Sequence, residues 1–224
     1  MHGAPDERGV AIAREGAPLA LDGIFLAAAG GSAADGAVIA PPHPLYGGSM
    51  QSPVVGEIAY ACQKAGIASL RFDWRGVGAS AGEPSGSARN ADQDFAAALG
   101  HLEETVNGEL LACGYSFGAA AALRAGAGHP RVTRLVLVSP PPGLLDRGAL
   151  ARFAGRVWMA TGEADAIAPA RELEALAARA RRARFLVIPE CDHFFAAGLA
   201  ELGRELSTWL AGSASAASEA RSEP

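Results

Sequence analysis

The sequence predicts an α/β fold in which a mostly parallel, doubly wound sheet is flanked by helices on both faces. Two observations carry this prediction. Short apolar segments rich in Val, Ile, Leu and Phe alternate along the chain with longer amphipathic segments. Segments that are apolar on both faces are typical of parallel strands covered by helices on two sides. The length of 224 residues is enough for one such domain with a full core.

The elements are expected to alternate from near the N-terminus to the C-terminus. The predicted strands are 37–40, 68–72, 110–113, 132–138, 157–161 and 185–188. The segments that suit helices are 53–65, 88–104, 118–125, 170–180 and 199–210. An additional edge strand or hairpin is expected within 18–29. Repeated strand–helix–strand units imply right-handed crossovers in one sheet.

Residues 1–211 are expected to form this single domain. Residues 212–224 are rich in Ser, Ala and Glu without periodicity, which predicts a disordered tail. The three cysteines match no zinc or disulfide pattern, and no segment has the apolar length of a signal peptide or a membrane span. A cytoplasmic protein is therefore predicted. The net charge of −5 gives no electrostatic basis for binding nucleic acid or anionic lipid.

The predicted strand 110–113 runs into the sequence Gly114-Tyr115-Ser116-Phe117-Gly118, and a helical segment follows at once. A strand, a sharp turn and a helix are the context in which Gly-x-Ser-x-Gly forms a nucleophile elbow. The glycines remove Cβ atoms that would clash in so tight a turn. The free N–H groups at the start of the helix favour developing negative charge. We therefore predict that Ser116 is a catalytic nucleophile.

A serine nucleophile needs a base, which is most often a histidine. Two histidines follow Ser116 in the chain. His129 falls between a helix and the next strand, which places it at the amino end of the sheet, opposite Ser116. His193 follows the last predicted strand and is therefore expected at the same carboxyl edge as Ser116. The sequence predicts that His193 is the base.

The base in turn needs a carboxylate, expected on the loop after the penultimate strand. That loop offers Glu163 and Asp165. Asp165 has the better reach because it lies at the tip of the turn, and Glu163 is the fallback. Asp192 is adjacent to His193 and is expected to serve its own turn. Serine, aspartate and histidine then follow one another in this order along the chain, which is the order typical of one class of hydrolases built on a mostly parallel sheet.

Four stretches of the sequence are distinctive. They are His43-Pro44-Leu45-Tyr46-Gly47-Gly48-Ser49-Met50, Arg71-Phe72-Asp73-Trp74-Arg75-Gly76-Val77-Gly78-Ala79-Ser80, the turn at Ser116, and Asp192-His193-Phe194-Phe195. Over about residues 8–211 the chain resembles the α/β-hydrolase superfamily, and within it the small, lid-less bacterial serine esterases related to the dienelactone-hydrolase group. Such proteins often begin the first stretch with His-Pro-His-Pro. This chain has Pro41-Pro42-His43-Pro44, so no catalytic role is expected at position 41.

The resemblance implies the α/β-hydrolase fold and an oxyanion hole made of two backbone N–H groups. Phe117, the residue after the nucleophile, supplies the first. The second is expected after strand 37–40, where Pro44 is excluded because it has no N–H. Leu45 fits the family pattern best, and its neighbours His43 and Tyr46 could replace it.

No lid domain fits the short segment between residues 138 and 157, where many relatives insert one. The site is therefore expected to be open, with an apolar mouth. The candidates for the substrate pocket are Tyr46, Trp74, Leu144 and Phe194, with Leu45, Leu145 and Phe195 close by. Asp73 and Arg75 are expected to support the turn after strand 68–72.

These residues predict a serine hydrolase that cleaves a carboxylic ester of a small or medium apolar acyl substrate through an acyl-enzyme on Ser116. The alternatives are a thioester, lactone or short-peptide hydrolase with the same triad, and a non-catalytic binding scaffold. Neither a cofactor nor a metal is expected, because this chemistry needs none. Cys191, Asp192 and His193 are adjacent and cannot all face one metal ion, and no second histidine has ligand spacing. A small-molecule ester is the expected partner, with no nucleic acid or membrane, for a monomer or a homodimer.

Overall fold

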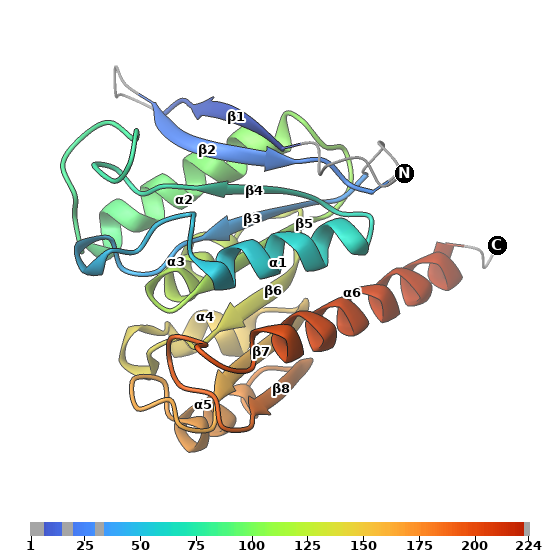
Figure 1. Ribbon diagram of the computed structural model, residues 1–224. Coiled ribbons are helices and arrows are strands. Elements are labelled where there is room, and N and C mark those ends of the chain that lie inside the picture. Colours follow the sequence, from blue (N-terminus) through green and yellow to red (C-terminus); the bar gives the residue numbers. More distant parts are fainter. Residues whose placement is uncertain (1–6, 15–19, 30–33, 222–224) are drawn as a thin grey trace.

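Eight strands form one sheet in the computed structural model, which describes residues 7–14, 20–29 and 34–221 (Figure 1). The strand order is β1-β2-β4-β3-β5-β6-β7-β8. The strands are β1 Glu7–Ile12, β2 Leu21–Leu26, β3 Gly36–Ala40, β4 Ala68–Phe72, β5 Leu110–Tyr115, β6 Val132–Val138, β7 Arg156–Gly162 and β8 Ala183–Ile188. β1 pairs with β2, and β2 with β4, in antiparallel fashion, whereas all pairings from β4 to β8 are parallel. The predicted mostly parallel sheet is confirmed.

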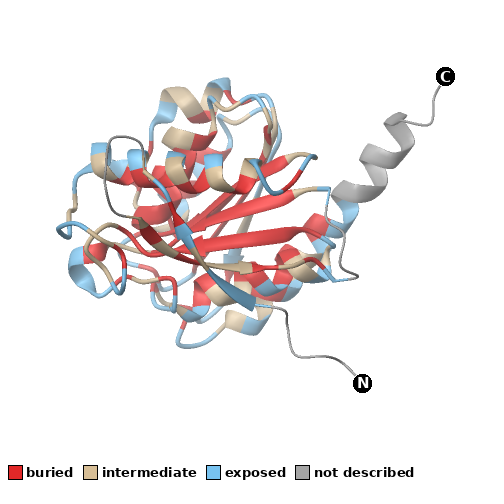
Figure 2. Cartoon of the chain, turned by 90° about the horizontal axis from the view of Figure 1, so that it is seen from above, coloured by how far each residue is buried: buried red, intermediate tan, exposed pale blue. Residues whose placement is uncertain are grey.

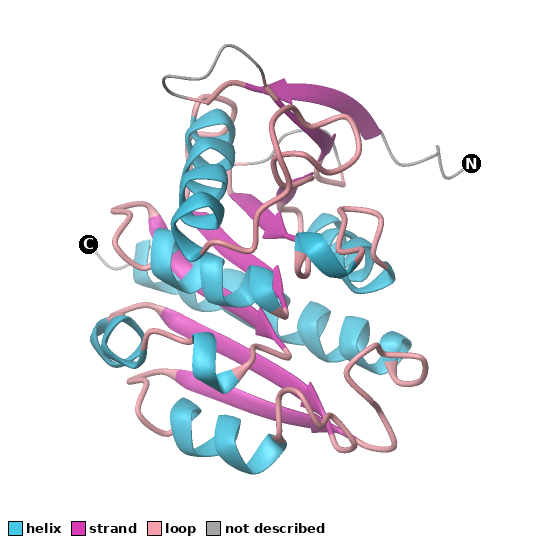
Figure 3. Ribbon diagram, turned by 90° about the vertical axis from the view of Figure 1, so that its left-hand side faces the viewer, coloured by secondary structure: helices cyan, strands magenta, loops and turns pink. Residues whose placement is uncertain are grey.

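Helices cover both faces of the sheet (Figures 1 and 3). α1 (Pro53–Lys64) and α6 (Leu199–Arg221) pack on one face, where Ile58 and Leu206 join a cluster with the inner side chains of β3, β5 and β7. The other face carries α2 (Ala88–Glu103), α3 (Phe117–Gly126), α4 (Arg147–Arg152) and α5 (Ala170–Ala177). This arrangement buries the central strands on both sides (Figure 2), which explains why their sequences are apolar without alternation.

The N-terminal part of the sheet differs from the prediction in one strand. The strand expected within 18–29 is β2, and residues 15–19 lie outside the described ranges. Its antiparallel partner β1 was not predicted from the sequence. β1 is the edge strand, and five of its six residues are at least partly exposed, so it lacks the apolar run that marks the central strands.

Two further differences concern helices. The short helix α4 lies in the segment between β6 and β7, where Asp146 caps it by accepting the Ala149 N–H at 2.9 Å. α6 continues to Arg221 rather than ending at residue 210. Disorder of residues 212–224 stays a prediction. Within the described ranges, no helix has both the length and the apolar character that a membrane span needs.

The topology brings several loops together at the carboxyl edge of the parallel strands. β3 lies beside β5, so the chain that leaves β3 passes over the start of α3. The two backbones approach so closely that a Cβ on Gly118 would meet the carbonyl oxygens of Ala40 and Pro41. The loops after β7 and β8 reach the same edge, since these two strands are paired in parallel.

Candidate active site

Ser116 occupies a tight turn between β5 and α3. Its backbone has φ 56° and ψ −120°, a left-handed conformation that is rare for a residue with a side chain. Its N–H donates to the Val138 carbonyl of the neighbouring strand at 2.8 Å. A Cβ on Gly114 would meet the backbone of Gly118. The flanking glycines are therefore what allows the chain to turn here, and the turn places the hydroxyl beyond the end of the strand.

His193 and Asp165 complete a chain of hydrogen bonds with Ser116. The Ser116 Oγ lies 3.0 Å from His193 Nε2. His193 Nδ1 lies 2.9 Å from both carboxylate oxygens of Asp165. All three residues are buried. The arrangement fits a catalytic triad, assembled from the residues and in the order that the sequence predicts.

The surroundings of Asp165 keep its carboxylate ionised. Its Oδ1 accepts the N–H groups of Ile167 at 2.9 Å and Ala168 at 2.7 Å, and the Thr161 hydroxyl lies 3.1 Å from Oδ2. Burial alone would raise the pKa of Asp165, but the hydrogen bonds from His193 and the Ala168 N–H outweigh it and lower that pKa. An ionised carboxylate only accepts hydrogen bonds, so His193 Nδ1 carries the proton and Nε2 is free to accept from Ser116.

The other polar residues considered for the triad lie elsewhere. Glu163 Oε2 accepts the Glu190 N–H at 3.1 Å. Asp192 Oδ1 accepts the N–H groups of Phe194 and Ala196, so it serves its own turn as predicted. His129 Nε2 lies 3.4 Å from Glu103, at the opposite end of the sheet.

Tyr115, the residue before Ser116, is a further residue of this site, and no role was predicted for it from the sequence. Its hydroxyl donates to the main-chain carbonyl of His193 at 2.6 Å, and its ring packs against those of His193 and Phe195. The residue before the serine therefore ties the histidine loop to the central strand. That loop is strained, because Glu190 and Phe195, on either side of His193, also have positive φ. An aromatic residue with a polar tip at the end of a buried strand was the available signal.

The loop after β3 has a different arrangement of N–H groups from the one expected. The Leu45 N–H donates to His43 Nδ1 at 3.2 Å, and the Tyr46 N–H donates to the His43 carbonyl at 3.1 Å. Burial lowers the pKa of His43, which favours the neutral ring that can accept at Nδ1. The His43 N–H itself has no acceptor among the described residues. Of the three candidate donors, His43 is the one whose N–H is available.

An apolar rim surrounds the triad. Large apolar side chains that are exposed at this edge follow β3, β6, β7 and β8, and they are Leu45, Tyr46, Leu144, Ile167 and Phe194. Tyr46 and Phe194 are the most open, at 87% and 73% exposed. Leu145 and Phe195, expected at the mouth, are buried beneath it. Trp74, expected to line the pocket, is 1% exposed and is therefore buried beneath the surface.

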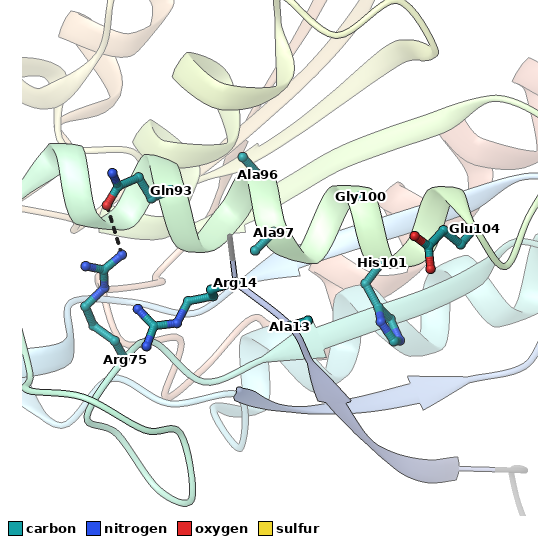
Figure 4. A pocket seen from close by; sticks show the side chains of 9 residues that line it. All are labelled: Ala13, Arg14, Arg75, Gln93, Ala96, Ala97, Gly100, His101 and Glu104. Atoms are coloured by element: carbon teal, nitrogen blue, oxygen red, sulfur yellow. Dashed lines mark hydrogen bonds between the residues drawn. The ribbon is translucent and has the colours of Figure 1, made fainter. Parts of the chain in front are cut away.

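A cavity of about 660 Å³ lies away from this rim, along α2 beside the end of β1 (Figure 4). Arg14 and Arg75 lie at one end of it, and His101 and Glu104 at the other. The Arg75 guanidinium is already bound to the buried carboxylate of Asp94 at 2.7 Å. No triad residue lines this cavity, so hydrogen-bond geometry rather than cavity size locates the candidate site.

Known protein sequences similar to this chain include hydrolases. The model of the serine aminopeptidase S33 family matches residues 45–144. The uncharacterized protein RP471 of Rickettsia prowazekii (strain Madrid E) is 28% identical over 185 residues, which are 78% of this chain and 77% of that protein. Thiohydrolase apmlB of Arthrinium phaeospermum is 42% identical over 91 residues, 38% of this chain. The match spans only 30% of the thiohydrolase's own length.

Solved structures similar to this one include α/β serine hydrolases. An alpha-beta serine hydrolase homologue from Coxiella burnetii has a TM-score of 0.83 and 25% identity, with 93% of this chain and 99% of that chain covered. XC6422 from Xanthomonas campestris, an α/β serine hydrolase without lid, has a TM-score of 0.77 and 26% identity, with 90% and 93% covered. In this chain too, only a short turn of 3-10 helix (Pro142–Leu144) and α4 lie between β6 and β7.

Proposed function

We propose that this chain is an α/β serine hydrolase without a lid, and that it hydrolyses carboxylic esters whose acyl group is small or medium-sized and apolar. The observation that carries the proposal is the hydrogen-bond chain from Ser116 through His193 to Asp165, with distances of 3.0 and 2.9 Å. This order of serine, histidine and carboxylate is the arrangement that nucleophilic attack by serine requires.

The reaction follows from this chain of hydrogen bonds. As the Ser116 Oγ bonds to the ester carbonyl carbon, its proton passes to His193 Nε2, and Asp165 stabilises the imidazolium that forms. His193 then gives this proton to the departing alkoxide, which leaves as the alcohol. A water molecule attacks the acyl-enzyme by the same route in reverse, releasing the acid and restoring the Ser116 hydroxyl.

The negative charge on the tetrahedral oxygen needs two N–H donors. We assign the first to Phe117, which opens α3 beside the nucleophile. We move the second from Leu45 to His43, because the Leu45 N–H is already bonded to the His43 ring. Either donor contributes about 3 kcal/mol to transition-state stabilisation in comparable sites.

The acyl group is proposed from the apolar rim. Tyr46, Leu144 and Phe194 are exposed around the triad, and so are Leu45 and Ile167. Burying such side chains against an acyl chain favours binding by about 25 cal/mol for each Å² of apolar surface. An open rim without a lid suits a short or medium chain better than a long one.

A thioester is the second candidate, favoured by the partial match to a thiohydrolase. Thioester hydrolysis uses the same attack on a carbonyl carbon, and only the leaving group differs.

The proposal is tested with p-nitrophenyl esters of two to twelve carbons and the thioesters of the same acids, using Ser116→Ala as the blank. We expect wild-type turnover to peak at a short or medium acyl length, and Ser116→Ala to lose at least about 10⁴-fold in kcat. A fluorophosphonate should label the wild type alone. If a folded wild type shows neither turnover nor labelling, a non-catalytic binding scaffold is the better account. If kcat/KM is higher for thioesters than for esters, the second candidate is favoured.

A further inference from the structure

A single peptide unit after β3 carries the second proposed oxyanion donor. In Pro41-Pro42-His43-Pro44 the three prolines have no N–H, so His43 provides the one amide hydrogen of this stretch. The orientation of the Pro42–His43 peptide therefore decides where that hydrogen points. The inference that follows rests on the proposed function, because it concerns the stabilisation of the tetrahedral oxygen.

Trp74 holds this peptide from below. It follows β4, its side chain is buried, and its indole Nε1–H lies 2.9 Å from the Pro42 carbonyl oxygen and 3.2 Å from that of Pro41. A trans peptide is planar, and its C=O and N–H point in opposite directions. A donor that fixes the Pro42 oxygen on one side therefore fixes the His43 N–H on the other.

The Trp74 ring also contacts the residue that provides the other donor. Trp74 packs edge-on against Phe117, with ring centroids 5.7 Å apart, and Phe117 in turn packs against the His43 ring at 4.6 Å. Phe72 supports Trp74 from behind at 4.9 Å. One buried side chain thus contacts both the peptide that carries the His43 N–H and the ring of Phe117.

The far end of the same loop is held by the neighbouring residue. Asp73 Oδ1 accepts the Met50 N–H at 2.6 Å. Asp73 and Trp74 consequently hold the loop 41–50 at both ends, but only Trp74 bonds to the peptide that carries the His43 N–H. Only Trp74 is therefore expected to control the orientation of the His43 N–H.

We propose that Trp74 is a positioning residue for catalysis, which aims the His43 N–H at the oxyanion by holding the Pro42 carbonyl. It touches no substrate, so its removal should weaken transition-state binding and leave substrate binding nearly unchanged. An N–H that is misaligned stabilises the oxyanion less than one held in place, and complete loss of a donor costs about 10²–10³-fold in kcat.

The test is Trp74→Phe, which keeps an aromatic ring in the core and removes the indole N–H. The matched control is Trp158→Phe in β7, because Trp158 is also fully buried and its Nε1 has no acceptor among the described residues. We expect Trp74→Phe to lower kcat by about 10–100-fold with KM changed less than twofold. Inhibition by a trifluoromethyl ketone, which forms a tetrahedral adduct, should weaken by the same factor. Trp158→Phe should keep kcat within twofold of the wild type.

Hydrogen exchange of the loop 41–50 supplies a readout that does not depend on turnover. Faster exchange in Trp74→Phe than in Trp158→Phe is expected, at equal melting temperatures or after correction for their difference. A Trp74→Phe enzyme with kcat within threefold of the Trp158→Phe control, or with unchanged exchange in this loop, would overturn the proposal. An inactive wild type would instead show that the proposed function is wrong, and this is evident before any tryptophan is replaced.

Discussion

Asp165→Asn is expected to lower kcat about 10⁴-fold while the protein stays folded. The structure dictates how the amide must sit. Oδ1 already accepts N–H groups from Ile167 and Ala168, so an NH₂ group there would face two donors, and the amide oxygen must take this position. The NH₂ group then takes the place of Oδ2 and faces His193 Nδ1.

The consequence falls on the tautomer of His193. The amide oxygen already accepts two backbone N–H groups, and the NH₂ group at the Oδ2 position would meet a proton on Nδ1 across 2.9 Å, which favours Nδ1 as an acceptor. The ring proton then moves to Nε2, which faces the Ser116 hydroxyl at 3.0 Å and can no longer accept its proton. A 10⁴-fold loss corresponds to about 5 kcal/mol of transition-state stabilisation.

The assay is steady-state hydrolysis of the best p-nitrophenyl ester, with circular dichroism and thermal melting to verify folding. Asp192→Asn is the matched control, since Asp192 precedes His193 but uses its carboxylate only for the N–H groups of Phe194 and Ala196. It should retain kcat within about threefold of the wild type. An Asp165→Asn enzyme with more than a tenth of wild-type kcat would refute the assignment of the acid, and a large loss in Glu163→Gln would transfer the role to the fallback.

Three further outcomes are expected. Gly118→Ala should destabilise the protein by about 3 kcal/mol or more and reduce activity in a thermal-melt and esterase assay, because the new Cβ would meet two main-chain carbonyl oxygens that cannot move independently. Asp94→Ala should cost about 3–5 kcal/mol in urea unfolding, because it leaves the Arg75 guanidinium without its buried partner at 2.7 Å. Iodoacetamide should not label Cys191 in the folded protein at pH 8, because burial and then the charges of nearby aspartates raise the pKa of this thiol to about 11; labelling should increase only as the pH rises toward that value.

Each of these has a control within the chain. Gly100 lies in α2 with open space at its Cβ position, so Gly100→Ala should stabilise the protein by up to about 1 kcal/mol. Glu205 pairs with Arg184 on the surface, and Glu205→Ala should cost less than about 1 kcal/mol. All three cysteines should react once the chain is unfolded in guanidinium. A Gly118→Ala protein as stable as Gly100→Ala, an Asp94→Ala loss no larger than that of Glu205→Ala, or rapid labelling of native Cys191 would contradict the corresponding argument.

The central strands could be predicted from the sequence because they are apolar on both faces and stand out as short apolar runs. Parallel pairing of these strands then places Ser116, Asp165 and His193, each of which follows a strand, at one edge of the sheet. β1 escaped prediction because an exposed edge strand has no such run. α4 escaped because a helix of six residues has little periodicity to detect.

The N–H groups of the loop after β3 were harder to predict for a physical reason. Family pattern favoured Leu45, but a side chain two residues away captures its N–H, and such local competition between a ring nitrogen and the backbone depends on side-chain orientation. The prediction that Trp74 lines the pocket was wrong for a similar reason. The sequence shows that Trp74 follows the end of β4, but its burial depends on how the loop after β3 folds over it.

The position of β8 at the edge of the sheet has a consequence for how the proposed activity would be lost. Ser116 follows a central strand paired on both sides, whereas the loop carrying His193 follows a strand paired with β7 alone among the described strands. Partial opening at an edge costs less free energy than global unfolding. Inactivation by heat or denaturant should therefore precede the loss of the core. The Tyr115 hydroxyl on the His193 carbonyl opposes this opening, because it links the loop after the edge strand to β5, the strand that leads into Ser116.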